Sequence, residues 1–545
     1  MTVNVSDFLR AAAENDPDGT ALVEHRPAWV PGAGRQVVQS ERHDLSWADL
    51  DSAADAIARS LSGRGLVAGQ RVAIVMANRI DLPIAYFGIL RGGMVAVPMN
   101  PRSTTREIAR MLEDAKAKVV LCDESGATQV REALAGDSGP TDCAVVVDGI
   151  DPLEGETSFS DFLAQAPDVE PAAPRDAEAL GVILYTSGTS GKPRGVMLSH
   201  RALIANIEQT AAIDPPPVTS DDICLGLLPM FHIYGLNAVL GQAVRQGACT
   251  LMVDGFDPAG LLDTIVAEGV TNLPLAPPVV AAWAGRDDLR EKLAGVNLVL
   301  SGASNLDPEL AAGFFESSGH HVEQGYGLTE TSPVIATTLG SPRGPDDAPK
   351  PGSVGRPLPG IEVRVVDSGG NDSAPGDPAE LWVRGDNVFS GYWPDGVDGP
   401  HEDGWYPTGD IGLIDEDGDL MLVDRLRELV IVSGFNVYPF EVEEVIAEVE
   451  GVAEVAVVGT PDEETGEAVL AFVVPSDVAA GDDVGSVEDE LRTKVQEHCA
   501  GRLARFKQPS RVVVVTGLPH SATGKVAKGR LRALARSDDL GLQAQ

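Results

Sequence analysis

Cysteine, lysine and long apolar runs are all scarce in this chain of 545 residues. Its five cysteines are scattered, odd in number and never spaced as C-x-x-C. This pattern argues against a disulfide scaffold and a zinc site, and it indicates a reducing cytoplasm. No run of about 18 apolar residues exists, so we expect no membrane-spanning helix. The first residues have neither a basic flank nor an apolar stretch, so we expect no signal peptide.

Basic residues are outnumbered two to one by acidic residues, 41 against 82, and only nine of the basic residues are lysine. The resulting net charge of −41 repels nucleic acid and anionic membranes, so neither is expected as a partner. We interpret the charge as a solvated surface that keeps the protein soluble. Adaptation to high salt is the alternative hypothesis. The oligomeric state is left open, with a homodimer as one option.

The first third of the chain alternates helical and strand patterns. Ser46–Asp49 has the spacing of a helix-capping box, and a helical pattern follows it to Gly63. Apolar strands are expected at Arg71–Met76, Met94–Val97 and Lys118–Cys122, with helices between them. This alternation predicts a mostly parallel sheet that is covered on both faces. We interpret residues 136–176, which are rich in Asp, Pro, Gly and Ala, as a surface excursion.

The composition changes near residue 345, where Gly and Pro become frequent and short β-like runs appear. Leu413–Val423 predicts a hairpin with its turn at Asp417-Gly418. Because one core rarely exceeds about 250–300 residues, two domains are expected. The predicted class is α/β. Residues 1–424 form a large domain of mostly parallel, helix-covered sheets with a small β-structured part, and residues 425–545 form a small α+β domain.

The segment Val182–Gly195 carries the strongest chemical pattern. An apolar strand runs into a loop that holds hydroxyls, glycines and two cations. Glycines let backbone N–H groups approach an anion, and hydroxyls add donors, so the loop is predicted to bind phosphate. It is not a Walker P-loop, because Thr186 stands where the first glycine belongs and Pro193 replaces the Ser/Thr.

Five segments in order resemble the motifs of the adenylate-forming superfamily, which includes acyl-CoA synthetases, luciferases and adenylation domains. They cover nearly the whole chain, and the match is closest to the fatty-acid–CoA ligase branch of the acyl-CoA synthetases. The segments are Tyr185–Gly195, Gly325–Glu330, Trp405–Asp410, Asp424–Ile431 and Pro519–Lys525. The resemblance implies an AMP-forming ligase that uses ATP, Mg²⁺ and coenzyme A, acts on a small-molecule carboxylic acid, is cytoplasmic and has no integral membrane association.

By this resemblance, phosphate oxygens are held by the loop residues Thr186, Ser187, Gly188, Thr189, Ser190, Gly191 and Lys192. Thr329 is expected at the α-phosphate, and Glu330 is the expected Mg²⁺ ligand. Asp410 is expected to accept hydrogen bonds from the ribose, with Arg425 assisting at the ribose or phosphate. The adenine is expected between Tyr326 and the backbone of Ser301, Gly302 and Ala303, and Gly325 and Gly327 are counted with these nucleotide-binding residues.

Lys525 is the residue that we expect to be catalytic. The resemblance implies that it bridges the acid carboxylate and the α-phosphate, a role that suits a compact cation on a long stem. The small domain is expected to be mobile, turning about Asp424 so that the thiol arm of coenzyme A passes Ser433 and Gly434. Departures from the family pattern are Arg194 and Arg427 for lysines, Ser190 and Ser521 for threonines, and Pro407 for arginine.

The acid pocket is less clear in the sequence. Leu228–Asn237 resembles the segment that walls the acyl site and places His232 near the carboxylate, although a structural histidine is the alternative. Gly325, Gly327, Val334 and Ile335 are further expected walls. The predicted substrate is a medium- or long-chain fatty acid.

Three other functions are kept open beside the fatty-acid ligase. One is an aromatic, 4-coumarate-type CoA ligase, because His232–Asn237 resembles that group. Another is an acyl-AMP ligase with a carrier-protein acceptor or a luciferase, although no carrier domain is expected after the last helix. The third is a catalytically silent nucleotide-binding regulator. His320-His321 is interpreted as a surface turn and not as a metal site.

Overall fold

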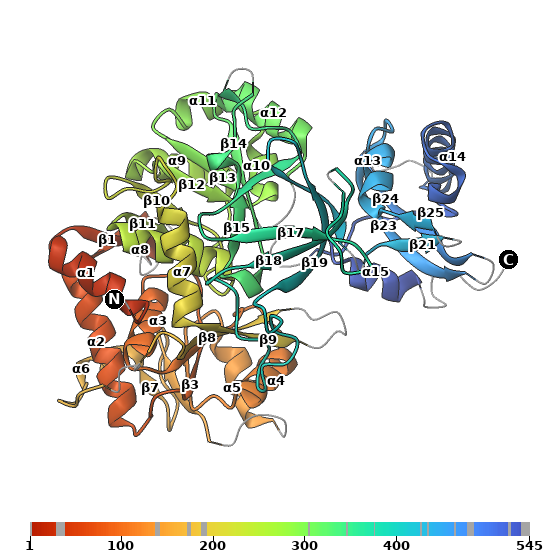
Figure 1. Cartoon of the computed structure of the whole chain (residues 1–545). Coiled ribbons are helices and arrows are strands. Elements are labelled where there is room, and N and C mark those ends of the chain that lie inside the picture. Colours follow the sequence, from red (N-terminus) through yellow and green to blue (C-terminus); the bar gives the residue numbers. More distant parts are fainter. Residues whose placement is uncertain are drawn as a thin grey trace. The chain divides into compact units, whose positions relative to one another are not determined.

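Two compact units make up the chain in the computed structural model (Figure 1). The larger unit contains Met1–Val363 and Val383–Tyr406, and the smaller contains Arg364–Trp382 and Pro407–Gln545. The predicted α/β class, with a large amino-terminal and a smaller carboxyl-terminal domain, is confirmed. The structure describes residues 3–28, 39–136, 142–171, 176–186, 193–302, 306–344, 347–374, 376–425, 428–432, 435–462, 465–476, 484–520 and 525–535.

One sheet of the larger unit has the strand order β7-β6-β5-β3-β4-β8-β9. All neighbouring pairs are parallel except β8 and β9, which form an antiparallel pair. Helices α4 and α5 contribute to the same apolar cluster as these strands. The strands are β3 (Arg71–Val75), β4 (Val95–Pro98), β5 (Val119–Cys122), β6 (Ala144–Val147), β7 (Thr157–Ser158), β8 (Leu180–Thr186) and β9 (Arg194–Ser199).

A second sheet of the larger unit is parallel from β1 through β14 and ends in antiparallel strands. Its strand order is β16-β15-β14-β13-β12-β10-β11-β1-β2. Trp283, Phe314 and apolar side chains of α9 and α12 pack with it. The strands are β1 (Thr20–Ala28), β2 (Gln39–Ser46), β10 (Ile223–Gly226), β11 (Cys249–Met252), β12 (Asn272–Leu275), β13 (Leu298–Ser301), β14 (Val322–Gly327), β15 (Val334–Thr337) and β16 (Ser353–Pro357).

Local sequence signals set several helix starts in this unit. The Ser46 hydroxyl accepts from the Asp49 amide at the start of α2, and Thr104 and Glu107 form a reciprocal capping box at the start of α4. The helices are α1 (Ser6–Asn15), α2 (Trp47–Gly63), α3 (Asp81–Arg91), α4 (Thr105–Ala115), α5 (Ala127–Ala135), α6 (Phe159–Ala164), α7 (His200–Ala211), α8 (Gln242–Gln246), α9 (Pro258–Glu268), α10 (Pro277–Trp283), α11 (Leu289–Lys292) and α12 (Pro308–Ser318), with the π-helix η1 (Tyr234–Gly241) and the 3₁₀ turns η2 (Thr329–Thr331) and η3 (Thr338–Gly340).

The smaller unit contains two groups of strands. One group has the order β17-β18-β19-β20, and the other has the order β22-β21-β24-β23, with β25 beside β24. The predicted hairpin is present, since β19 and β20 pair antiparallel and Gly418 has φ 88°. The elements are β17 (Glu362–Val366), β18 (Ala379–Arg384), β19 (Tyr406–Ile414), β20 (Leu420–Arg425), β21 (Val430–Val432), β22 (Phe435–Val437), α13 (Pro439–Ala447), β23 (Val452–Asp462), β24 (Gly466–Pro475), α14 (Val484–Arg502), η5 (Arg505–Lys507), β25 (Arg511–Val514) and α15 (Lys528–Ala535).

The interpretation of residues 136–176 as a surface excursion is wrong in its centre. Ala144–Val147 forms β6, which pairs in parallel with β5, and Val146 and Val147 are buried. The strand has only four residues between polar flanks, so its hydrophobic pattern is too short to distinguish a strand from a loop. In the described part of the chain, no helix is long and apolar enough to cross a membrane.

Candidate active site

The segment that we expect to bind phosphate is flanked by β8 and β9. Thr186 and Arg194 are directly opposite each other at the ends of these two antiparallel strands. The Tyr185 hydroxyl donates to Asp114 at 2.6 Å, which anchors the loop's first strand to α4. Of the predicted loop residues, Thr186 is described and partly exposed. The others, Ser187 to Lys192, lie outside the described residues.

Neighbouring parallel strands bring the expected adenine-binding segments together. Ser301 at the end of β13 is paired with Gln324 on β14, so Gly302 and Gly325 follow at the same sheet edge. This carboxyl edge of parallel strands is where α/β sheets commonly bind ligands. Tyr326 is buried, and so is the Ser301 hydroxyl, which has no hydrogen-bond partner among the described residues. Ala303 lies outside the described residues.

A tight turn follows β14 and carries Thr329 and Glu330. A Cβ on Gly327 would lie 1.8 Å from the Pro333 carbonyl oxygen, so a side chain there would force the turn open. The Thr331 hydroxyl donates to the same oxygen at 2.6 Å and fixes the turn internally. This turn also contacts β9, so the expected metal ligand and the base of the phosphate loop are neighbours.

The carboxylate of Glu330 is held by a tyrosine that the sequence interpretation did not single out. The Tyr392 hydroxyl donates to Glu330 Oε1 at 2.6 Å. Burial, together with the nearby Glu330 charge, raises the pKa of the Tyr392 phenol to about 12, so the hydroxyl keeps its proton at neutral pH. The Phe389 amide donates to the Glu330 carbonyl at 2.9 Å. Both the backbone and the side chain of Glu330 are therefore fixed by residues 389–392.

At the expected wall of the acid pocket, the Tyr234 ring packs against Gly302. A Cβ on Gly302 would lie 2.5 Å from Cε1 of Tyr234, so the ring covers this glycine closely. Tyr234 packs on an apolar cluster of Leu228, Val239 and Ala276. Burial raises the pKa of the Tyr234 phenol. Tyr234 begins the π-helix η1, an irregular helix form that is frequent at functional sites.

His232 lies just before this π-helix and is partly exposed. Its ring centroid is 4.8 Å from that of Phe231, and its amide donates to the Pro229 carbonyl at 3.1 Å. Of the other expected walls, Val334 is partly exposed and Ile335 is buried. A Cβ on Gly325 would meet only the Ala336 carbonyl oxygen, at 3.9 Å, so space remains at that point.

The smaller unit carries the remaining described site residues. Asp410 and Arg425 are directly opposite each other on β19 and β20, and Asp410 is buried. Lys525 is exposed and precedes Val526, which forms a β-bridge with His520. Ser433 and Gly434 lie outside the described residues.

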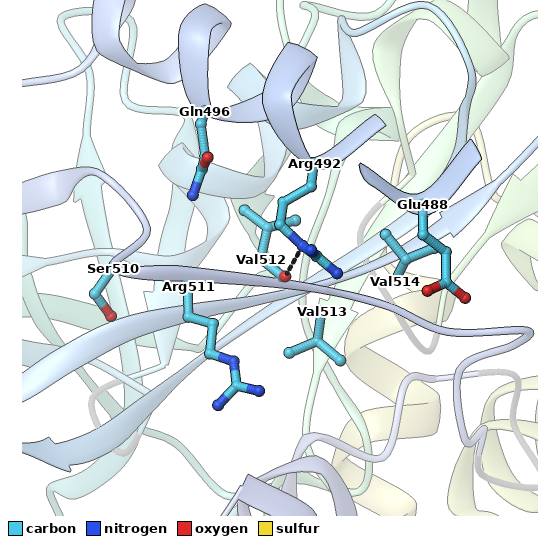
Figure 2. Close-up of a pocket in the computed structure, with 8 residues that line it drawn as sticks. All are labelled: Glu488, Arg492, Gln496, Ser510, Arg511, Val512, Val513 and Val514. Carbon is cyan, nitrogen blue, oxygen red and sulfur yellow. Dashed lines mark hydrogen bonds between the residues drawn. The ribbon is translucent and has the colours of Figure 1, made fainter. Parts of the chain in front are cut away.

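A cavity of about 360 Å³ in the smaller unit lies between α14 and β25 (Figure 2). Its lining includes Glu488 and Gln496, and Arg492 donates from Nε to the Val512 carbonyl at 3.2 Å. None of the expected site residues lines this cavity, so we assign it no part in the reaction.

Comparison with known proteins decides the family. The family model for AMP-binding enzymes matches residues 9–393, and the model for the AMP-binding enzyme C-terminal domain matches residues 441–525. This chain belongs to the AMP-binding enzyme family. Together with the relatives and solved structures that resemble it, this membership makes the chain an ATP-dependent, AMP-forming acid–CoA ligase of the acyl-CoA synthetase branch.

Relatives of two substrate classes resemble the chain equally in identity. A long-chain-fatty-acid–CoA ligase of Salmonella typhimurium is 33% identical over 503 residues, which cover 87% of each chain. The 4-coumarate–CoA ligase 5 of Oryza sativa subsp. japonica is 33% identical over 501 residues, covering 90% of this chain and 89% of the relative. The crystal structure of ATP-bound MatB from Rhodopseudomonas palustris has a TM-score of 0.84 at 30% identity, covering 98% of this chain and 99% of MatB.

Buried asparagines position the site of this AMP-binding enzyme, and the sequence interpretation missed them. The Asn206 side chain donates from Nδ2 to the Val334 carbonyl at 2.7 Å, and its Oδ1 accepts from the Val334 amide at 3.0 Å. Asn237 joins η1 to the turn after η2 by donating to the Leu203 and Ser332 carbonyls. Asn387 donates to the Thr331 carbonyl at 2.8 Å. These asparagines are recognised by their burial next to the motif residues. Burial is a property of the folded chain, so it could not be seen in the sequence.

Proposed function

We propose that this ligase activates a medium- or long-chain fatty acid. The observation that carries the proposal is the apolar packing at the expected acid wall, where Leu228, Val239 and Ala276 form one buried cluster against which Tyr234 packs. An apolar wall favours an apolar chain, at about 0.8 kcal/mol for each buried methylene group. The fatty-acid–CoA ligase relative supports the same class.

An aromatic acid is the second candidate substrate. The ring of Tyr234 beside Gly302 offers a flat surface on which an aromatic acid can pack. The 4-coumarate–CoA ligase relative has the same identity to this chain as the fatty-acid ligase. The two classes therefore have to be separated by rate measurements.

The proposed reaction has two steps, and both balance. The acid carboxylate oxygen attacks the α-phosphorus of ATP, and the bond to the β-phosphate oxygen breaks, giving acyl-AMP and diphosphate. The thiol of coenzyme A then loses its proton, its sulfur attacks the acyl carbon, and AMP leaves as the thioester forms. In the first step two anions meet, so charge neutralisation and alignment dominate the barrier.

The chain's residues divide this work in the proposed mechanism. The loop from Thr186 to Lys192 holds the β- and γ-phosphates, and Thr329 donates to the α-phosphate. Lys525 bridges the carboxylate and the α-phosphate. Asp410 accepts from the ribose, and Arg425 assists at the ribose or phosphate. For the second step, the smaller domain turns at Asp424, and the thiol arm passes Ser433 and Gly434.

Glu330 fits a magnesium ligand by its chemistry. Oε1 accepts from Tyr392, and Oε2 accepts no hydrogen bond from the described residues, so one carboxylate oxygen remains for a cation. Within the described residues no group of three His, Cys, Asp or Glu side chains is arranged to hold a metal ion. Mg²⁺ usually takes one or two carboxylates and completes its shell with phosphates and water. When bound, Mg²⁺ neutralises phosphate charge.

The test is a comparison of kcat/KM for hexanoate, dodecanoate, hexadecanoate, benzoate and 4-coumarate at fixed ATP and coenzyme A. We expect dodecanoate or hexadecanoate to exceed both aromatic acids by at least about ten-fold, because several extra methylene groups contact the wall. A higher kcat/KM for 4-coumarate would transfer the assignment to the aromatic class. Equal rates for all five acids would contradict a wall that selects by chain length.

A further inference from the structure

We propose that Tyr392 is a positioning residue that orients the Glu330 carboxylate for the metal-bound nucleotide, and that Arg194 fixes the Tyr392 ring. This inference rests on the proposed role of Glu330 as the magnesium ligand. Tyr392 itself is 8% exposed, and its hydroxyl donates to Glu330 Oε1 at 2.6 Å.

The first argument is the geometry at Glu330. A tyrosine hydroxyl that donates to a carboxylate forms a charge-assisted hydrogen bond, which is shorter and stronger than a neutral one. The bond selects one oxygen and one rotamer, and it leaves the second oxygen for a cation. Groups that orient a metal ligand in this way typically change metal affinity by about 10- to 100-fold when they are removed.

The second argument is the fixation of the ring itself. The guanidinium carbon of Arg194 lies 3.6 Å from the Tyr392 ring centroid, and Arg194 Nη2 is 2.6 Å from Asp398 Oδ2. Phe389 meets the same ring edge-on, with centroids 5.1 Å apart. A planar guanidinium stacks on an aromatic face while also binding a carboxylate, which a lysine ammonium does less well.

The third argument is where Arg194 stands in the chain. It is the first residue of β9, paired with Thr186 across the base of the phosphate loop. Val196, two residues further on, forms a β-bridge with Tyr392. A displacement of the loop base therefore reaches Glu330 through two contacts, Arg194 to Tyr392 and Tyr392 to Glu330. Arg194, which replaces the family's usual lysine, stacks on the Tyr392 ring and also pairs with Asp398.

The test measures metal binding as well as turnover. Mn²⁺ is titrated by electron paramagnetic resonance into the full chain with a non-hydrolysable ATP analogue, for the wild type and the variants Tyr392→Phe, Glu330→Gln and Tyr86→Phe. Tyr86 is a fully buried tyrosine whose hydroxyl has no partner among the described residues, so its variant controls for loss of a buried hydroxyl. In parallel, the Mg²⁺ concentration for half-maximal adenylation is determined.

We expect Tyr392→Phe to raise the Mn²⁺ dissociation constant and the half-maximal Mg²⁺ concentration by about ten-fold, with kcat at saturating Mg²⁺ changed less than about two-fold. Tyr86→Phe should match the wild type. If Glu330→Gln weakens Mn²⁺ binding and Tyr392→Phe behaves like Tyr86→Phe, the inference is overturned while the role of Glu330 stands. If Glu330→Gln changes nothing, the proposed role of Glu330 fails first.

Arg194→Lys provides a second route if Tyr392→Phe does not fold. This variant keeps the positive charge and removes the stacked plane, so Mn²⁺ binding should weaken by about three-fold while the melting temperature stays near that of the wild type. Unchanged Mn²⁺ affinity in a folded Arg194→Lys protein would overturn the part played by Arg194.

Discussion

Two lysines stand three residues apart near the end of the chain, and their surroundings differ. Lys528 is 14% exposed and lies 3.1 Å from Glu428 and 2.8 Å from Glu443. Lys525 is exposed. A lysine that must reach a substrate at one stage and withdraw at another needs a solvent-exposed side chain. At the scale of single residues, this contrast favours Lys525 as the catalytic cation.

Lys525→Ala should lower carboxylate-dependent exchange of diphosphate with ATP by about 10²- to 10³-fold, because in the proposed mechanism the variant loses the cation that neutralises the developing charge. Thioester formation from supplied acyl-AMP should be largely kept, since that step does not join two anions. Lys494→Ala, on the surface of α14 and paired with Glu490, is the matched control. Normal exchange in Lys525→Ala would remove this lysine from the mechanism.

Gly302 and Tyr234 allow a test of the acid wall by a double-variant cycle. Gly302→Ala should lower kcat/KM for the best acid by about ten-fold, because the added methyl must displace the Tyr234 ring. Adding Tyr234→Ala should recover a large part of that loss, which is the coupling expected of residues in contact. Gly313→Ala serves as the control, because among the described residues no atom outside its own helix backbone and chain neighbours lies within 4 Å of the added Cβ. Strictly additive losses would contradict the contact.

A partly buried carboxylate, Asp148, lies at the end of strand β6. Asp148 follows Val147 directly, and its Oδ2 is buried without a hydrogen-bond partner among the described residues. Burial, then the negative charge of Asp81, raises the pKa of the Asp148 carboxyl to about 6. Between pH 3.8 and 6 the folded chain therefore binds a proton that the unfolded chain has released, and stability falls as pH rises through this window.

Asp148→Asn should raise the free energy of unfolding of the larger unit at pH 7.5 by about 1–2 kcal/mol, because the native state no longer contains this ionised carboxylate. At pH 4, where the carboxyl is largely protonated in the folded protein, the gain should shrink toward zero. Urea denaturation of the wild type and the variant at pH 7.5 and pH 4 measures the two differences in the free energy of unfolding. Asp151→Asn, an exposed carboxylate in the same loop, is the control. A gain that is equal at both pH values would contradict the charge argument.

Elements with strong local patterns were predicted well from the sequence, and contacts between distant residues were not. The capped helix α2 and the hairpin of β19 and β20 follow from short-range signals, so the sequence displays them. Strand β6 was missed because four apolar residues between polar flanks give little periodicity. The bond from Tyr392 to Glu330 joins residues 62 positions apart, and only the folded chain shows such a pair.

Charge dominates the behaviour expected of the whole molecule. A net charge of −41 opposes compaction, and this repulsion extends about 30 Å at 0.01 M salt but only about 3 Å at 1 M. If the acidic surface reflects adaptation to high salt, the melting temperature should rise by several degrees between 0.01 and 1 M NaCl. Repeating the scan in 1 M KCl separates screening from an ion-specific effect. A flat melting temperature would leave solubility as the function of the charge.

The most direct test of the central claim is to identify the products formed from ATP, Mg²⁺ and a fatty acid, with and without coenzyme A, by mass spectrometry. We predict that acyl-CoA and AMP form together in equal amounts when coenzyme A is present, and that without it acyl-AMP is made only up to the enzyme concentration. Acyl-AMP accumulating with no thioester in the presence of coenzyme A would contradict the assignment and point to a protein acceptor. No adenylate from any acid would contradict catalysis itself.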